Sequence, residues 1–230
     1  MGAGGAGGPS LGAVIRAVLF DFGGVILSSP FDAFARYEAD NDLPEGLLRR
    51  INATNPDTNA WARLERSEVD LDGFCTLFEA EAAALGHAVD ARRVLELLAG
   101  ELRPQMVAAL RALHDDERYA TAMLTNNIVT MPGDETHSAH VDREHEMAQV
   151  RACFDVIIES SKIGVRKPEP RFYELACVAL DIEPTEAVFL DDLGVNLKPA
   201  RAMGMTTIKV TDPDEALAEL ESVLGHPIGG

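Results

Sequence analysis

The sequence AVLFDFGGV, residues 17–25, joins a short apolar run to an aspartate and two glycines. Its first four residues have the continuous apolar pattern of a strand buried on both faces, which is typical of a parallel sheet. Similar apolar runs recur at residues 120–124, 154–158, 187–190 and 206–210. Helical patterns lie between them, at residues 104–114, 169–180, 196–203 and 214–224. This alternation predicts an α/β fold with a Rossmann-like parallel sheet that carries helices on both faces.

A long insert interrupts the alternation after the first predicted strand. Residues 31–100 contain no strand-like run, whereas apolar residues recur there at helical spacing, as in Leu71, Phe74 and Phe78. Asp70 is placed to cap the helix that begins at Leu71. We therefore expect a core built from residues 13–30 and 101–230, with residues 31–100 inserted as a helical cap over the active edge of the sheet.

Two segments are predicted to be irregular. Residues 1–12 are rich in glycine and offer nothing to bury, which is typical of a disordered tail. Residues 131–150 start with polar and turn-forming residues, so we expect a mobile loop there.

Composition argues against several classes of partner. The 230 residues include 20 Lys+Arg and 38 Asp+Glu, which gives a net charge of −18. Such acidity argues against nucleic acids and anionic membranes, and an anionic substrate would need a local device such as a metal ion. No apolar run approaches the roughly 18 residues that span a bilayer. The N-terminus does not resemble a signal peptide, and three widely spaced cysteines do not suggest a disulfide framework, so we expect a cytoplasmic protein.

Four short polar motifs follow the predicted strands. They are Asp21-Phe22-Gly23-Gly24-Val25, Thr125-Asn126-Asn127, Arg166-Lys167-Pro168-Glu169-Pro170 and Asp191-Asp192-Leu193-Gly194-Val195-Asn196. Ligands of open parallel sheets bind at the carboxyl ends of the strands, so we expect these motifs to form one site.

The residue types in these motifs suit phosphoryl transfer. A carboxylate such as that of Asp21 can attack phosphorus and form an aspartyl-phosphate. Since the nucleophile and the phosphate are both anionic, a divalent cation is needed between them, and Mg²⁺ prefers oxygen ligands. Asp21, Asp192 and the backbone carbonyl of Gly23 would supply those oxygens. Thr125 can donate to phosphate oxygens, and Lys167 can offset the charge that accumulates in the transition state.

Together these motifs resemble the haloacid dehalogenase (HAD) superfamily in order and spacing, over residues 16–228. Longer stretches point to a subgroup: LTNN (124–127), KPEPRFYELA (167–176) and VFLDDLGVNLKPARAMGMTTIKV (188–210). They are similar to the N-terminal phosphatase domain of soluble epoxide hydrolase and to the HAD-like N-terminal domain of acyl-CoA dehydrogenase family member 10. The position of the insert also resembles the helical cap of this family.

The resemblance implies a HAD-like hydrolase that acts as an Mg²⁺-dependent phosphatase on a small phosphorylated metabolite. The residues it implicates share a place at the strand ends. They are Asp21 as the nucleophile, Thr125 and Asn126 as ligands of the phosphoryl oxygens, Lys167 as the balancing charge, Asp192 as a metal ligand, and Asp191 as an orienting group or weak ligand.

One position departs from the family pattern. Phosphatases of the superfamily usually have Asp-x-Asp at the first motif, where the second Asp is the general acid and base, and this chain has Gly23 there. Such a group typically contributes about 10²–10⁴-fold, or roughly 3–5 kcal/mol of barrier. The backbone carbonyl of residue 23 does not depend on the side chain, so the predicted metal site is retained.

Two alternatives stay open. Hydrolytic haloacid dehalogenases of the superfamily also use a strand-end Asp, lack the second Asp and need no metal, although the pair Asp191-Asp192 argues against this assignment. The other alternative is a catalytically weak domain that binds a phosphorylated metabolite or a partner protein.

Overall fold

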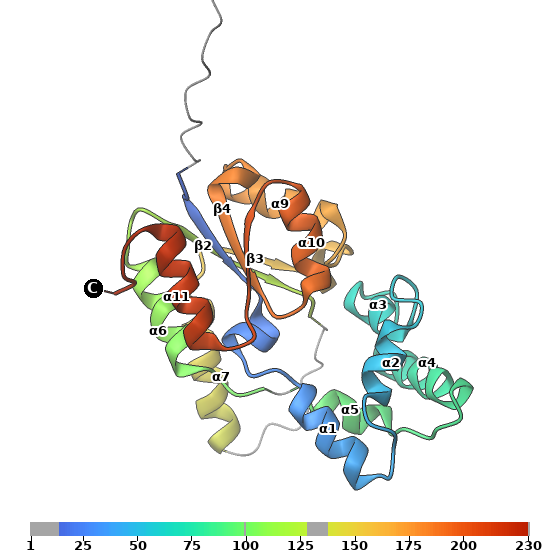
Figure 1. Ribbon diagram of the computed structural model, residues 1–230. Helices are drawn as coiled ribbons and strands as arrows, with labels where there is room; N and C mark the ends of the chain where they lie inside the picture. Colours follow the sequence, from blue (N-terminus) through green and yellow to red (C-terminus); the bar gives the residue numbers. More distant parts are fainter. Residues whose placement is uncertain (1–13, 99, 128–137, 230) are drawn as a thin grey trace, which may run out of the picture.

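A parallel five-stranded sheet forms the centre of the protein (Figure 1). The computed structural model describes residues 14–98, 100–127 and 138–229, so the predicted tail at residues 1–12 lies outside the described residues. The strands are β1 (Ala17–Phe20), β2 (Ala120–Thr125), β3 (Val156–Glu159), β4 (Ala187–Asp191) and β5 (Thr206–Lys209). Their order across the sheet is β3-β2-β1-β4-β5, and every neighbouring pair is parallel. The predicted α/β fold is confirmed.

The register brings the strand ends to the same level. Phe20, the last residue of β1, is aligned with Met123 of β2 and with Leu190 of β4. Because β1 is the central strand and its neighbours are parallel to it, the residues that follow β1, β2 and β4 meet at one edge of the sheet.

Helices cover both faces of the sheet, which explains why β1 is continuously apolar. Val18 and Phe20 pack on one face against α6 (Pro104–His114), α7 (Ser138–Arg151) and α11 (Pro213–Leu224). Ala17 and Leu19 pack on the other face against α9 (Pro170–Leu180) and α10 (Gly194–Ala202). Shorter turns lie at Phe22–Ile26, at α8 (Ser160–Ile163) and at Pro184–Glu186.

α7 corrects the sequence-based expectation of a loop over residues 131–150. Residues 128–137 lie outside the described part of the chain, but a helix runs from Ser138 to Arg151. Its apolar content is low, yet Val150 is fully buried and Met147 packs against the same cluster as β1. Met147 and Val150, at helical spacing, pack the described end of this helix on the sheet, and the polar composition around them concealed the pattern.

Five helices form a second group with its own core (Figure 1). They are α1 (Phe31–Asp40), α2 (Leu47–Ala53), α3 (Ala60–Glu65), α4 (Leu71–Ala84) and α5 (Ala91–Glu96). Trp61 lies 4.7 Å from Phe74 between ring centroids, and Phe74 stacks on Phe78 at 5.3 Å. Asp70 caps α4 by accepting a 2.8 Å hydrogen bond from Gly73, which confirms that prediction. We call residues 31–100 the insert.

The two ends of the insert lie side by side. Leu27 and Leu102 form an isolated antiparallel bridge, and the backbone N–H of Ser28 donates to Glu101 at 2.7 Å. The chain therefore leaves the core and returns to it through one pair of adjacent segments, beside the edge where β1 ends. Within the described residues, none of the helices combines the length and the apolarity needed to cross a membrane. The three cysteines are free thiols.

Candidate active site at the carboxyl ends of the strands

Acidic and basic side chains from separate motifs meet just beyond the ends of β1 and β4. Asp21 follows β1, and Asp191 is the last residue of β4. Lys167 reaches them from the loop between α8 and α9. Asp21, Asp191 and Asp192 each offer one carboxylate oxygen, and these three oxygens lie within 4.8 Å of one another. Sequence reasoning expected these motifs at one site, and the structure brings them there.

Lys167 is buried between two carboxylates. Its side chain is 1% exposed, and Nζ lies 2.9 Å from Asp21 Oδ1 and 2.7 Å from Asp191 Oδ2. Burial by itself lowers the pKa of Lys167, but the charges of Asp191 and Asp21 outweigh it and raise that pKa above its ordinary value. The lysine therefore keeps its positive charge inside the site.

Asp191 uses both carboxylate oxygens within the protein. Besides Lys167, it accepts a 2.8 Å hydrogen bond from the backbone N–H of Leu193, and the amide of Asn196 donates to both oxygens at 3.0–3.1 Å. Asn196 is itself held by Tyr173, whose hydroxyl donates to the Asn196 carbonyl at 2.7 Å. This arrangement suits Asp191 to orienting Lys167. The sequence analysis assigned no role to Asn196. Its position five residues after Asp191, in the same motif, could have indicated this contact.

Asp192 is the least engaged of the three carboxylates. Among the described residues, no other side chain donates a hydrogen bond to it. Burial raises its pKa to about 6, with Asp191 adding to the shift and Lys167 opposing it. Its carboxylate packs directly on Gly24, where an added Cβ would lie 2.3 Å from Oδ2. Gly24 also has φ +82°, a conformation that favours glycine.

Gly24→Ala is expected to destabilise the protein by about 1–3 kcal/mol, because it adds backbone strain to a clash with Asp192. Gly23→Ala is the matched control, since Gly23 has φ −74° and a Cβ there would meet nothing within 4 Å. Thermal unfolding of the two variants and of the wild type provides the measurement. Equal melting temperatures for the two variants would contradict the close packing of Gly24 on Asp192.

The charge balance at Asp21 favours a bound cation. Burial raises the pKa of Asp21 to about 8; Lys167 opposes the shift, while the charges of Asp191 and Asp192 add to it. One ammonium group faces three carboxyl groups, so the site disfavours ionised Asp21 unless a further positive charge, such as a metal ion, is bound beside it. Hard oxygen donors in excess of the local positive charge are the donor set that Mg²⁺ prefers, and the residues present fit such an ion.

Thr125 and Asn126 differ in what they leave available to a ligand. Thr125 is buried at the end of β2, and its hydroxyl makes no hydrogen bond within the described part of the chain. The Asn126 side chain is already engaged with Lys167: Oδ1 accepts from the Lys167 N–H at 2.8 Å, and Nδ2 donates to the Lys167 carbonyl at 3.0 Å. Asn126 therefore fixes the loop that carries Lys167, whereas Thr125 can donate to a ligand.

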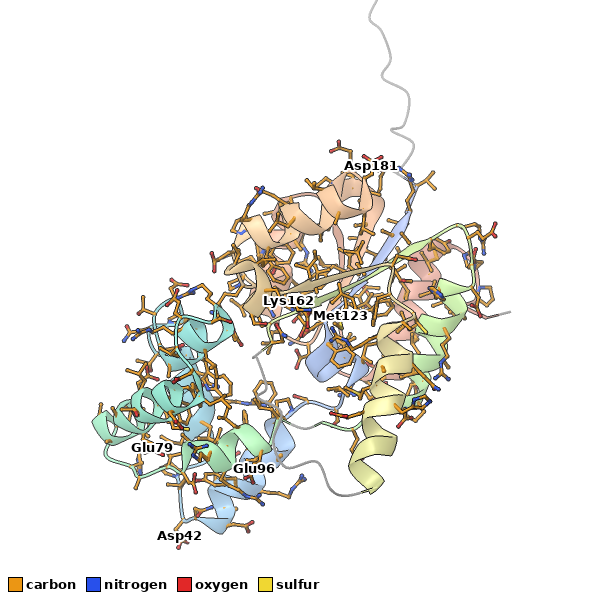
Figure 2. All side chains as sticks on the ribbon, turned by 180° about the vertical axis from the view of Figure 1, so that it is seen from behind. Asp42, Glu79, Glu96, Met123, Lys162 and Asp181 are labelled. Carbon is orange, nitrogen blue, oxygen red and sulfur yellow. The ribbon has the colours of Figure 1, made fainter. Side chains whose placement is uncertain are left out.

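A separate cavity lies at the other end of the sheet. It has a volume of about 620 Å³, and its lining includes Arg16, Asp181 and Glu186. These residues lie at the amino-terminal side of β1 and β4. Figure 2 shows Asp181 at the end of the core opposite Lys162 and the insert. The candidate site is therefore identified by its chemistry, and the cavity is distinct from it.

A family model described as haloacid dehalogenase-like hydrolase matches residues 15–204. Mouse acyl-CoA dehydrogenase family member 10 is 34% identical over 93% of this chain, and pig bifunctional epoxide hydrolase 2 is 32% identical over 92% of it. This chain spans only 19% and 39%, respectively, of the length of those two relatives.

Two further matches extend over most of this chain and most of the matched protein. A sesquiterpene phosphatase of Aspergillus oryzae is 27% identical over 91% of this chain and 97% of its own length. The crystal structure of a HAD family enzyme from Bacteroides thetaiotaomicron, in complex with magnesium and inorganic phosphate, has a TM-score of 0.54. It is 17% identical and covers 85% of this chain and 93% of its own, which supports the likeness in fold.

Proposed function

Since this chain belongs to the haloacid dehalogenase-like hydrolase family, we propose that it is an Mg²⁺-dependent phosphatase that cleaves a small phosphorylated metabolite. The observation that carries this proposal is the buried Lys167, held between Asp21 and Asp191 with Asp192 beside them. A carboxylate nucleophile and a fixed ammonium group, next to further carboxylates, are what an aspartyl-phosphate mechanism requires. The similarity to a named phosphatase over nearly the whole chain supports the same conclusion.

Asp21 is the proposed nucleophile. Its Oδ1 accepts hydrogen bonds from the backbone N–H of Phe22 at 2.6 Å and from Lys167, which leaves Oδ2 to attack phosphorus. The bond from phosphorus to the leaving oxygen breaks as the bond to Asp21 forms. Water then attacks the aspartyl-phosphate, and the bond from phosphorus to Asp21 breaks. Inorganic phosphate is released, and the free carboxylate of Asp21 is restored.

Lys167 and Thr125 would stabilise the charge on the transferring group. Lys167 carries a fixed positive charge beside the attacking carboxylate, and its position costs no reorganisation during the reaction because Asn126 and Asp191 already hold it. The hydroxyl of Thr125, which has no hydrogen-bond partner among the described residues, can donate to a phosphoryl oxygen. Asp21 and Asp192 would hold Mg²⁺, together with the carbonyl of Gly23, while Asp191 is committed to Lys167 and Asn196. The ion would supply positive charge to the phosphate oxygens.

The insert is proposed to act as a cap that selects the substrate. The four strand-end motifs provide generic phosphoryl chemistry that does not select one substrate. The insert joins the core beside that edge of the sheet, so it is the part of the chain that can contact the rest of the substrate. Relatives named for a sesquiterpene and for validoxylamine A 7′-phosphate favour small organic phosphates as the substrate class.

A panel of phosphorylated metabolites and aryl phosphates, assayed for phosphate release with and without Mg²⁺, tests the proposed function. We expect turnover that requires Mg²⁺ and is lost on chelation. Metal-independent release of halide from 2-haloacids would instead support dehalogenation. Binding of a phosphorylated compound with no turnover by a folded, Mg²⁺-loaded protein would support the binding-domain alternative.

Asp192→Ala is expected to weaken Mg²⁺ binding by at least roughly 10–100-fold, the loss that even indirect partners of a metal can cause. Asp192 is the least engaged carboxylate of the site and so the one most available to the ion. Isothermal titration with Mg²⁺ measures the affinity. Asp181→Asn, at the far end of the core, serves as the control, and equal affinities in both variants would rule out Asp192 as a ligand.

A further inference from the structure

A pair of oppositely charged side chains joins the insert to the loop that carries Lys167. Arg166 Nε donates to Glu65 Oε2, and the two side chains are each 15% exposed. Glu65 is the last residue of α3, and Arg166 lies in the loop between α8 and α9. The two residues are 101 positions apart, so their contact is purely tertiary.

Further contacts reinforce this junction. Arg166 Nη1 donates to the carbonyl of Pro56 at 3.0 Å, so one guanidinium binds two separate points of the insert. The hydroxyl of Ser67 donates to the carbonyl of Ser161 in α8 at 2.9 Å. On the core side, the N–H of Arg166 donates to Glu169 Oε1 at 3.2 Å, which ties the loop to the start of α9. A guanidinium with several donors in a fixed plane is suited to holding such a junction in one geometry.

Arg166 is the direct chain neighbour of Lys167, so the loop is held from two sides. On the core side, Asn126 makes two hydrogen bonds to the backbone of Lys167. On the insert side, Glu65 and Pro56 hold Arg166. The position of Lys167 Nζ between Asp21 and Asp191 therefore depends on a loop with one anchor in each part of the molecule.

Burial gives this contact more weight than a surface ion pair. Exposed pairs contribute little because water screens them, whereas removing one partner of a buried pair leaves an uncompensated charge. The exposed pair Arg171–Glu174, on α9, has side chains that are 59% and 48% exposed and contacts no part of the insert through this interaction. It provides a matched control of the same charge types, a few residues further along the chain.

We propose that Glu65 and Arg166 couple the insert to catalysis: Arg166 is a positioning residue that fixes Lys167 only while α3 is docked. The insert thereby acts on the chemical step as well as on substrate choice. This inference rests on the proposed function for its kinetic part. Its structural part, the coupling of the insert to the Lys167 loop, stands without it.

Kinetics of Glu65→Gln, Arg166→Gln and the double variant test the kinetic part. Each single variant is expected to lower kcat roughly 10- to 100-fold with a smaller change in KM, since a misplacement of about 1 Å can cost 10²-fold. The double variant should have a kcat no lower than that of the less active single variant, because both substitutions break the same contact. Arg171→Gln should leave kcat unchanged. Multiplying effects of the two single changes would overturn the coupling.

Backbone hydrogen exchange tests the structural part without any activity. In Arg166→Gln and in Glu65→Gln, exchange should become faster both in residues 160–169 and in residues 54–68, while the strands keep their protection. An acceleration of exchange that is limited to the mutated side of the junction would overturn the proposal. If Arg166→Gln fails to fold, Arg166→Lys retains the charge but loses the two-point contact and should show the same local acceleration.

The two proposals fail in different ways. A wild-type protein without phosphatase activity on any substrate, combined with coupled exchange, would reject the proposed function and retain the junction. Full activity of both single variants, with exchange unchanged in residues 160–169, would reject the junction and retain the phosphatase.

Discussion

Asp21→Asn is expected to lower kcat by about 10³-fold or more, because it removes the group that forms the covalent intermediate. The asparagine has nearly the same size as the aspartate, and Lys167 keeps its contact with Asp191. The loss should therefore appear in turnover without loss of the fold. Phosphate release and circular dichroism on the same preparation provide the measurement.

The same variant has an expected effect on stability that depends on pH. Folding raises the pKa of Asp21 from 3.8 to about 8, chiefly through burial, so the folded state disfavours the ionised carboxylate. This group therefore makes the metal-free wild type less stable as pH rises from about 4 to about 8. Asn carries no such penalty, so Asp21→Asn should melt no lower than the wild type near pH 8 without Mg²⁺.

Asp181→Asn is the control for both measurements. Asp181 lies at the opposite end of the core (Figure 2). Its φ of +53° is a conformation that asparagine also tolerates. It should retain wild-type kcat and the wild-type pH dependence of stability. More than about a tenth of wild-type activity in Asp21→Asn would exclude Asp21 as the nucleophile, since loss of a nucleophile costs far more than tenfold.

Gly23→Asp is expected to raise the turnover of alkyl phosphates by up to about 10²–10⁴-fold, the usual contribution of a general acid. Without an acid at this position, the leaving group must depart as an anion or take its proton from water. Aryl phosphates leave readily as anions, so the wild type should prefer them, and the substitution should help them much less. Values of kcat/KM for one aryl and one alkyl phosphate, in both proteins, measure the effect.

The backbone of Gly23 permits this substitution. Its φ of −74° and ψ of 126° are ordinary for any residue, and an added Cβ would meet no atom within 4 Å. The new carboxyl group would lie two residues after Asp21, at an exposed position of the chain. Gly23→Asn is the matched control, because it has a similar size and can donate a hydrogen bond but cannot transfer a proton at neutral pH.

Three results would change this interpretation of Gly23. An equal gain in Gly23→Asn would mean that fit, and not proton transfer, limits the wild type. Equal rates on aryl and alkyl phosphates in the wild type would mean that another group supplies the proton. A folded Gly23→Asp protein that binds Mg²⁺ and turns over neither substrate would favour a binding function.

Sequence patterns alone determined the sheet, because burial on both faces leaves a continuous apolar run that ends at a polar residue. The run at residues 17–20 became β1 without change, and β4 extends one residue beyond its predicted end to include Asp191. Parallel pairing also determines that polar residues after these strands share one edge. That Asp21 and Asp191 lie at the same edge therefore followed from their positions in the chain, and the pairing of β1 with β4 brings them close together.

Tertiary structure decided what local patterns do not encode. Gly23 and Gly24 are adjacent glycines that the sequence does not distinguish. Of the two, only Gly24 has a positive φ, and the carboxylate of Asp192 packs against it. Asn126 is expected from the sequence to bind phosphoryl oxygens, and the structure adds that its side-chain amide holds the backbone of Lys167. The contact between Glu65 and Arg166 joins separate parts of the molecule. The hydrophobic period is a local property, whereas the order of the strands and the partner of a polar side chain depend on which distant segments pack together.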